Sequence, residues 1–161
     1  MMRRPRGARA LSLLIAGMLL AGGAHATEAE HIRASQPWLR VLPGDLPAGA
    51  YVTLENTGEQ PASLHGASSA TYASVMLHKS TTEGGMGRMT SVDNLVIPVH
   101  GKAQLSPGGY HLMLMKAAAT VKPGDQVKLT LIFGDGSKLD ADFLVRPANA
   151  TDADAGADHA H

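Results

Sequence analysis

The 161-residue sequence contains no cysteine. Without a thiolate, the chain has no cysteine nucleophile, no iron–sulfur cluster, no zinc–thiolate site and no blue-copper centre of the His₂Cys kind. A domain of this size buries enough apolar surface to fold without disulfides, even outside the cell. The absence of cysteine therefore excludes several kinds of chemistry but not a stable secreted domain.

Long apolar runs are also scarce, and the one at the N-terminus is short. Four arginines precede the apolar run at 11–23, which is followed by Ala24-His25-Ala26. A basic start, a short apolar segment and an A-x-A pattern are typical of a secretory signal peptide. The sequence therefore predicts a cleaved signal peptide over residues 1–26. No other run is long enough to span a bilayer after cleavage.

An excess of positive charge is missing as well. The whole chain has 14 lysines and arginines and 14 acidic residues, and four of the arginines lie in the predicted signal peptide. The mature chain then carries ten basic and fourteen acidic residues, a formal charge of −4. This balance argues against nucleic acid or an anionic membrane surface as a partner.

No stretch shows a sustained helical period, and the mature part alternates like short strands. Residues 50–56, 126–133 and 138–145 alternate apolar and polar side chains, and the segment GDGS between the last two predicts a hairpin turn. Further strands are expected near 35–41, 61–67, 72–78, 92–97, 103–105 and 110–116. This pattern predicts an all-β sandwich or barrel. The small, acidic segment 147–161 predicts a disordered tail.

Histidine and methionine gather in two segments. All five methionines of the mature chain lie in residues 75–89 and 110–116, and each segment also holds a histidine. Side chains alternate along a strand, so a strand at 110–116 places His111 and Met113 on one face and leucines on the other. Scattered core filling would not concentrate the methionines in this way.

Thioethers and imidazoles without carboxylates or thiolates favour Cu(I) over zinc, magnesium, calcium or manganese. His111 and Met113 are close enough along one strand to converge on one ion. His78 and Met89 would have to join them from a neighbouring strand and a glycine-rich loop.

The other histidines and methionines receive weaker roles. We expect Met76 and Met115 to serve packing, because nothing requires them as metal donors. Met86 remains open as an auxiliary donor on the loop. For the remaining histidines of the folded part we expect no metal role: His31, His65 and His100.

The spacing of four of these residues forms a longer pattern. His78, Met89, His111 and Met113 follow H-x10-M-x21-H-x-M. This pattern resembles the periplasmic copper chaperones of the PCu(A)C family, as do the segments GAYVTLENTGEQPASLHGASS, LSPGGYHLMLM and VKPGDQVKLTLIFGDGS. The resemblance covers roughly residues 35–146, which is essentially the whole expected domain.

The resemblance implies a cupredoxin-like Greek-key β-sandwich or barrel over residues 27–146. It implies an exposed Cu(I) site formed by His78, Met89, His111 and Met113. It also implies a periplasmic chaperone that delivers copper to cytochrome c oxidase, chiefly to its CuA centre. The partner would be an apo oxidase subunit or another copper-transfer protein, and we expect the chaperone to be a monomer. The tail leaves a second, weak Cu(II) site open, formed by His159 and His161 among aspartates.

Three other functions compete with copper delivery. Sequestration of periplasmic copper for resistance would use the same ligands, and the sequence does not separate it from delivery. A copper-free sandwich that binds proteins would leave the clustered methionines unexplained. An enzyme is disfavoured, because the sequence shows no paired carboxylates, no nucleophile with a base and no water-activating arrangement.

Overall fold

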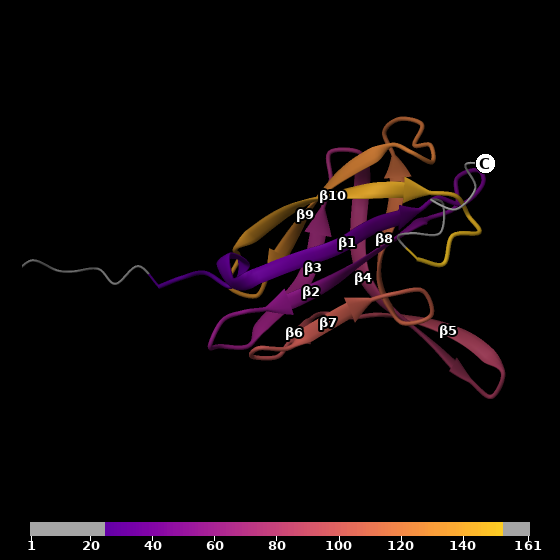
Figure 1. Cartoon of the computed structure of the whole chain (residues 1–161). Coiled ribbons are helices and arrows are strands. Elements are labelled where there is room, and N and C mark those ends of the chain that lie inside the picture. The colour runs from indigo at the N-terminus through magenta and orange to yellow at the C-terminus, as the bar shows by residue number, and fades with distance from the viewer. Residues whose placement is uncertain (1–24, 153–161) are drawn as a thin grey trace, which may run out of the picture.

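The computed structural model describes residues 25–152, and strands make up nearly all of its regular structure (Figure 1). The predicted signal peptide lies outside these residues apart from its last two positions, as do the tail histidines His159 and His161. A short 3₁₀ turn, η1 (Ala29–His31), precedes the strands. The strands are β1 (Ile32–Arg40), β2 (Ala48–Asn56), β3 (Ala62–Ser68), β4 (Tyr72–Glu83), β5 (Met86–Ser91), β6 (Leu95–Ile97), β7 (Lys102–Leu105), β8 (Tyr110–Ala117), β9 (Gln126–Phe133) and β10 (Lys138–Arg146). The all-β prediction is confirmed.

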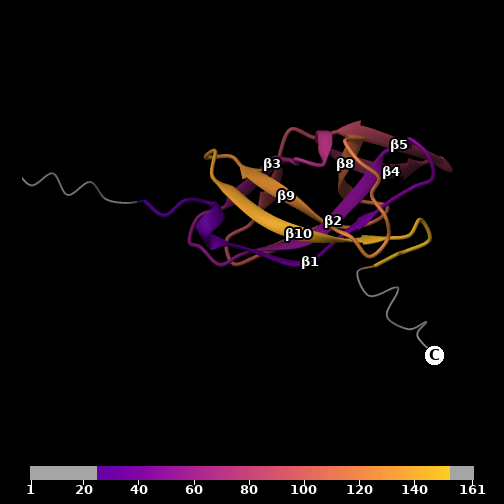
Figure 2. The same cartoon turned by 90° about the horizontal axis from the view of Figure 1, so that it is seen from above.

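The ten strands form one hydrogen-bonded sheet that folds over on itself. Its order is β5-β4-β8-β2-β1-β10-β9-β3-β6, with β7 pairing β2 outside this path. Figure 2 shows β1 and β10 on one side of the molecule and β4, β5 and β8 on the other. The two halves of the sheet therefore enclose a common core. Within residues 25–152, no helix has the length and apolar character needed to cross a membrane.

The core consists of the inward faces of these strands. Alternate leucines of β8 and β9 are fully buried, namely Leu112, Leu114, Leu129 and Leu131. Burial of each such side chain stabilises the fold by roughly 1.5–3 kcal/mol. Because side chains alternate along a strand, this burial also fixes which residues of β8 point outward.

A bulge in β1 changes the face to which its side chains point. The register shifts between Ser35 and Trp38, so that Gln36 and Pro37 together oppose a single residue of β2. Gln36 has a φ of 50°, in the left-handed region. Because the bulge adds one residue, Trp38 lies outside the main core, where it pairs with Tyr51.

The sequence predicts a disordered tail from Pro147, but the first part of this tail packs on the domain. Ala150 is 2% exposed and forms a small apolar cluster with Trp38 and Tyr51. Its carbonyl oxygen accepts a hydrogen bond of 3.2 Å from Arg40. The folded domain therefore extends past residue 146, because this alanine covers two aromatic rings that lie outside the main core.

Candidate metal centre

The centre is built on a direct pairing between β4 and β8. In this antiparallel pair, His78 lies opposite His111, and Met76 lies opposite Met113. Directly paired residues of a sheet point to the same face, so the four side chains form a two-by-two block. The alternate residues, among them Leu77, point into the core. The outward face is therefore the one that the alternation of the sequence predicts.

Met89 reaches the same face from the next strand. β4 and β5 form a hairpin with a two-residue turn, Gly84-Gly85, and both glycines have positive φ. Met89 pairs with Ser80 and therefore shares the face of His78. The expectation that Met89 lies in a loop is wrong, because two adjacent glycines allow a tight hairpin turn and the chain returns at once as a strand. Figure 1 shows this hairpin extending away from the body of the sandwich.

The His78 ring is nearly buried, and one of its nitrogens has no partner among the described residues. Its Nε2 lies 3.3 Å from the hydroxyl oxygen of Ser91, whereas its buried Nδ1 makes no hydrogen bond. Burial, together with repulsion from His111, lowers the pKa of His78 below its ordinary value. The ring is therefore neutral at neutral pH. An unsatisfied buried polar atom costs about 1–3 kcal/mol, and binding of a metal at Nδ1 would remove that cost.

His111 is held in a way that leaves one nitrogen open. Its Nδ1 lies 3.2 Å from the backbone carbonyl oxygen of Gly109, to which the Nδ1–H tautomer donates. That tautomer leaves the lone pair on Nε2 free to bind a metal. The centroids of the His78 and His111 rings are 5.9 Å apart, with planes at 80°. This separation fits one ion bonded by each ring at about 2 Å.

The thioethers lie at the rim of the centre. Met89 is 54% exposed and Met76 is 40% exposed, whereas Met113 is half-buried. Met115 shares this face but lies one pair further along β8. Met86 lies three positions before Met89, an odd step along a strand, and therefore lies on the opposite face of β5. The arrangement is thus two buried imidazoles bordered by two exposed methionines, Met76 and Met89, and by the half-buried Met113.

The other described histidines of the folded domain lie away from this block. His31 precedes β1 and His65 belongs to β3, and neither of these strands pairs with β4 or β8. His100 lies 3.0 Å from the carboxylate of Glu59, and both side chains are mostly exposed. Within residues 25–152, no three or more His, Cys, Asp or Glu side chains come together in a group that could hold a metal ion.

An aromatic wall, formed by Trp38 and Tyr51, borders the centre on the side of β2. The Tyr51 ring lies 6.5 Å from the His111 ring and 4.6 Å from the Trp38 ring, measured between centroids. Arg40 donates a hydrogen bond of 3.0 Å to the Tyr51 hydroxyl. Burial raises the pKa of Tyr51 despite this arginine, so the phenol stays neutral. The wall therefore gives His111 a rigid neighbour.

Gly49 makes room for this wall. A Cβ atom at Gly49 would lie 2.7 Å from the Tyr51 hydroxyl oxygen, and Gly49 is the β2 residue opposite Met113. The Tyr51 side chain therefore spans from His111 toward Met113. This role could not be predicted from the sequence, because Tyr51 occupies an ordinary outward position of an alternating strand.

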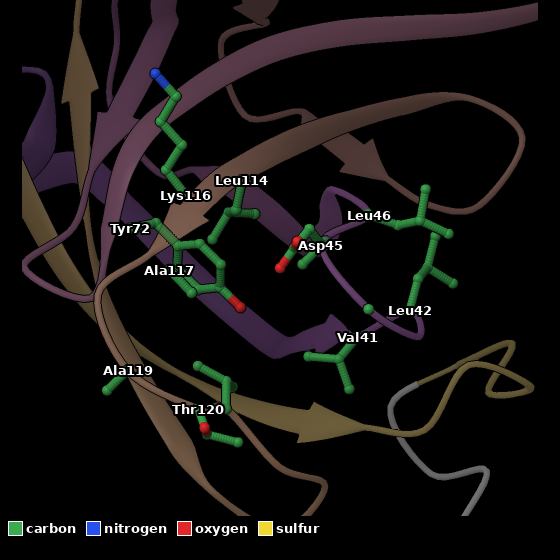
Figure 3. A pocket seen from close by; sticks show the side chains of 13 residues that line it. Val41, Leu42, Asp45, Leu46, Tyr72, Leu114, Lys116, Ala117, Ala119 and Thr120 are labelled. Atoms are coloured by element: carbon green, nitrogen blue, oxygen red, sulfur yellow. The ribbon is translucent and has the colours of Figure 1, made fainter.

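A groove of about 560 Å³ lies behind β8 (Figure 3). Its lining includes Leu42 and Leu46 of the β1–β2 connection, Tyr72 of β4 and Leu114 of β8. Leu114 alternates with Met113 along β8, so the groove opens on the opposite side of that strand. Its lining contains no histidine or methionine. The groove is therefore separate from the outward face of β4 and β8, which carries the paired histidines and methionines.

Comparison with known proteins gives matches to the folded part of the chain. Residues 29–145 match the family model "Putative lipoprotein LpqE-like". Putative lipoprotein Lxx21020 of Leifsonia xyli subsp. xyli (strain CTCB07) is 32% identical over 111 residues, covering 68% of this chain and 66% of that relative. The chain thus spans slightly less than two thirds of the relative's length.

Two copper-loaded domains are among the solved structures with a similar fold. The copper-bound PCuAC domain from PmoF2 has a TM-score of 0.62 and 26% identity, covering 76% of this chain and 98% of that one. The solution structure of CuI-DR1885 from Deinococcus radiodurans has a TM-score of 0.59 and 34% identity, covering 81% and 85%. The sandwich is therefore similar to these two copper-loaded domains in both sequence and fold.

Proposed function

The chain belongs to the LpqE-like family and is of the PCuAC type, and from this we propose that it binds Cu(I) in the periplasm and passes it to another protein. The proposed donors are His78, Met89, His111 and Met113. One observation carries the assignment: His78 faces His111 directly, and its buried Nδ1 has no partner among the described residues. The copper-bound relatives support copper as the ion.

The chemistry of the donors supports Cu(I) as the oxidation state. Imidazole and thioether are neutral and comparatively soft, so they hold a soft monovalent ion without the charge that hard divalent cations require. The buried rings of His78 and His111 would form the base of the site. The exposed thioether of Met89 could then be replaced by a donor from a partner protein while the rings still hold the ion.

Copper is cargo in this proposal, and the chain carries out no reaction on a substrate. The proposed acceptor is an apo subunit of cytochrome c oxidase, chiefly its CuA site, or another copper-transfer protein. Delivery by a monomer is the simplest arrangement, because the open rim lets a partner approach the ion. Sequestration for copper resistance is the second candidate, since the same exposed donors would serve it.

The metal assignment is tested by competition titration of the mature protein. We expect one equivalent of Cu(I) to be withdrawn from a chromogenic Cu(I) chelator, and Zn(II) to bind the same face much more weakly. The Met115→Leu variant is the matched control, since it alters a thioether on the same face without removing a proposed donor. Zinc affinity equal to that of Cu(I), or no copper binding, would refute the proposal and favour a copper-free interaction module.

The recipient is tested in a deletion strain. If the protein supplies cytochrome c oxidase, oxidase activity should fall at limiting copper and recover when copper is added. If it sequesters copper, the strain should instead become sensitive to excess copper with normal oxidase activity. The two phenotypes separate delivery from resistance.

A further inference from the structure

Met76 occupies a position that a packing role does not explain. It lies directly opposite Met113, and the adjacent pair along the two strands is His78 and His111. Its chain neighbours Val75 and Leu77 belong to or pack on the core, whereas Met76 points outward and is 40% exposed. A long apolar side chain that faces solvent beside two buried imidazoles fills no interior gap.

The geometry of the sheet places Met76 closer to β8 than Met89. Directly opposed residues have Cβ atoms about 4.5–5.5 Å apart, and residues two apart on a strand are separated by about 6.6 Å. All four members of the block can therefore reach a point above its centre. Met89 pairs with Ser80 on the far side of β4, so it is two strands away from Met113. Two strand spacings amount to about 9.5 Å.

We propose that Met76 is a fifth copper donor, and that it binds Cu(I) when the bond between Cu(I) and the Met89 sulfur breaks. This inference rests on the proposed function. The step is a ligand exchange in which the Cu–S bond to Met89 breaks and a Cu–S bond to Met76 forms. Copper stays Cu(I), and no proton or electron moves. Met89 belongs to an exposed edge strand, so an incoming partner can take its place while Met76, Met113 and the two imidazoles retain the ion.

The test is a double-mutant cycle with Met76→Leu, Met89→Leu and the double variant. Leucine conserves volume and removes the sulfur, so the fold should be preserved, as circular dichroism would verify. We expect each single variant to lose about tenfold or less in Cu(I) affinity, because the other thioether substitutes. The double variant should lose much more than the product of the two single effects. Met115→Leu, combined with Met89→Leu, is the matched control.

X-ray absorption at the copper edge supplies a second readout. The number of sulfur scatterers should be the same in the wild type and in Met89→Leu, and it should fall in the double variant. If Met76→Leu behaves like Met115→Leu in both backgrounds while His111→Ala abolishes copper binding, the role of Met76 is refuted and the proposed function survives. If His111→Ala keeps full affinity, the proposed function fails and this proposal fails with it.

Discussion

His78 and His111 face each other across β4 and β8, with ring centroids 5.9 Å apart and planes nearly perpendicular. The two residues are 33 positions apart in the sequence, and only the pairing of these strands brings them together. Each ring keeps one nitrogen that the described protein groups do not engage.

Removal of a donor on β8 should weaken copper binding severely. We expect His111→Ala and Met113→Ala each to lower Cu(I) affinity by more than about 100-fold, because changes to groups that merely support a ligand already cost about 10–100-fold. Met115→Leu should change affinity little, since it is a volume-conserving exchange one pair further along the strand. Chelator competition measures all three. A loss for Met115→Leu as large as that for Met113→Ala would contradict the assigned donors.

The apo protein should lose stability as pH falls below about 6.5. The pKa of His78 is lowered in the folded state, first by burial and then by His111. Between that lowered pKa and the unfolded value of about 6.5, the unfolded chain binds more protons than the folded chain, so acid favours unfolding. Urea denaturation at pH 7.5 and 5.5 checks this. His78→Gln, which cannot titrate, should show a smaller difference between the two pH values.

Copper affinity should decrease over the same range of pH without disappearing. Protons compete with the metal for an imidazole donor, whereas thioethers do not titrate. Chelator competition at pH 7.5, 6.5 and 5.5 measures the effect. An affinity that does not change with pH would argue that the imidazoles are not donors.

Truncation of the tail should have different effects at two positions. A chain that ends at Asp152 keeps Ala150 on the aromatic wall, so Cu(I) affinity and stability should match the full protein, and at most a weak Cu(II) signal should be lost. A chain that ends at Val145 loses this cover and the hydrogen bond from Arg40, which should cost about 1–3 kcal/mol of stability. Parallel Cu(I), Cu(II) and denaturant titrations separate the cases. A large loss of Cu(I) affinity in the chain that ends at Asp152 would place part of the main site in the tail.

Gly49→Ala should disturb both the fold and the centre. The new Cβ would lie 2.7 Å from the Tyr51 hydroxyl, and Tyr51 cannot swing away freely because Trp38 and Arg40 hold it. We expect a destabilisation of about 1–3 kcal/mol, together with weaker copper binding. Gly66→Ala is the matched control, since no atom lies within 4 Å of its Cβ. Equal effects of the two variants would mean that the contact with Tyr51 has no importance.

The face of each strand could be predicted from the sequence, whereas the pairing between strands could not. Alternation along 110–116 already separates His111 and Met113 from the leucines, because the period of a strand is two. Nothing local specifies that His78 lies opposite His111 or that Met76 lies opposite Met113. These registers depend on long-range packing, so the sequence favours packing for Met76 without deciding whether it assists the site.

Two local features also escaped prediction for physical reasons. The Gly84-Gly85 pair fits both a flexible loop and a tight turn, and the pairing of β4 with β5 selects the turn. Ala150 sits in a segment of small and polar residues, and its burial depends on aromatic rings contributed by distant strands. The composition of these segments therefore predicts neither the tight turn at Gly84-Gly85 nor the burial of Ala150.

Because of the bulge at Gln36 and Pro37, the surroundings of the proposed copper site can be changed without substituting any proposed copper donor. If the same residues of β1 paired with β2 without the bulge, Trp38 would turn toward the interior and Tyr51 would lose its stacking partner, while every histidine and methionine stayed in place. The backbone of β1 would thus act on a centre that β4 and β8 carry. Protein engineers who wish to vary copper affinity without changing a donor would therefore begin with the bulge in β1.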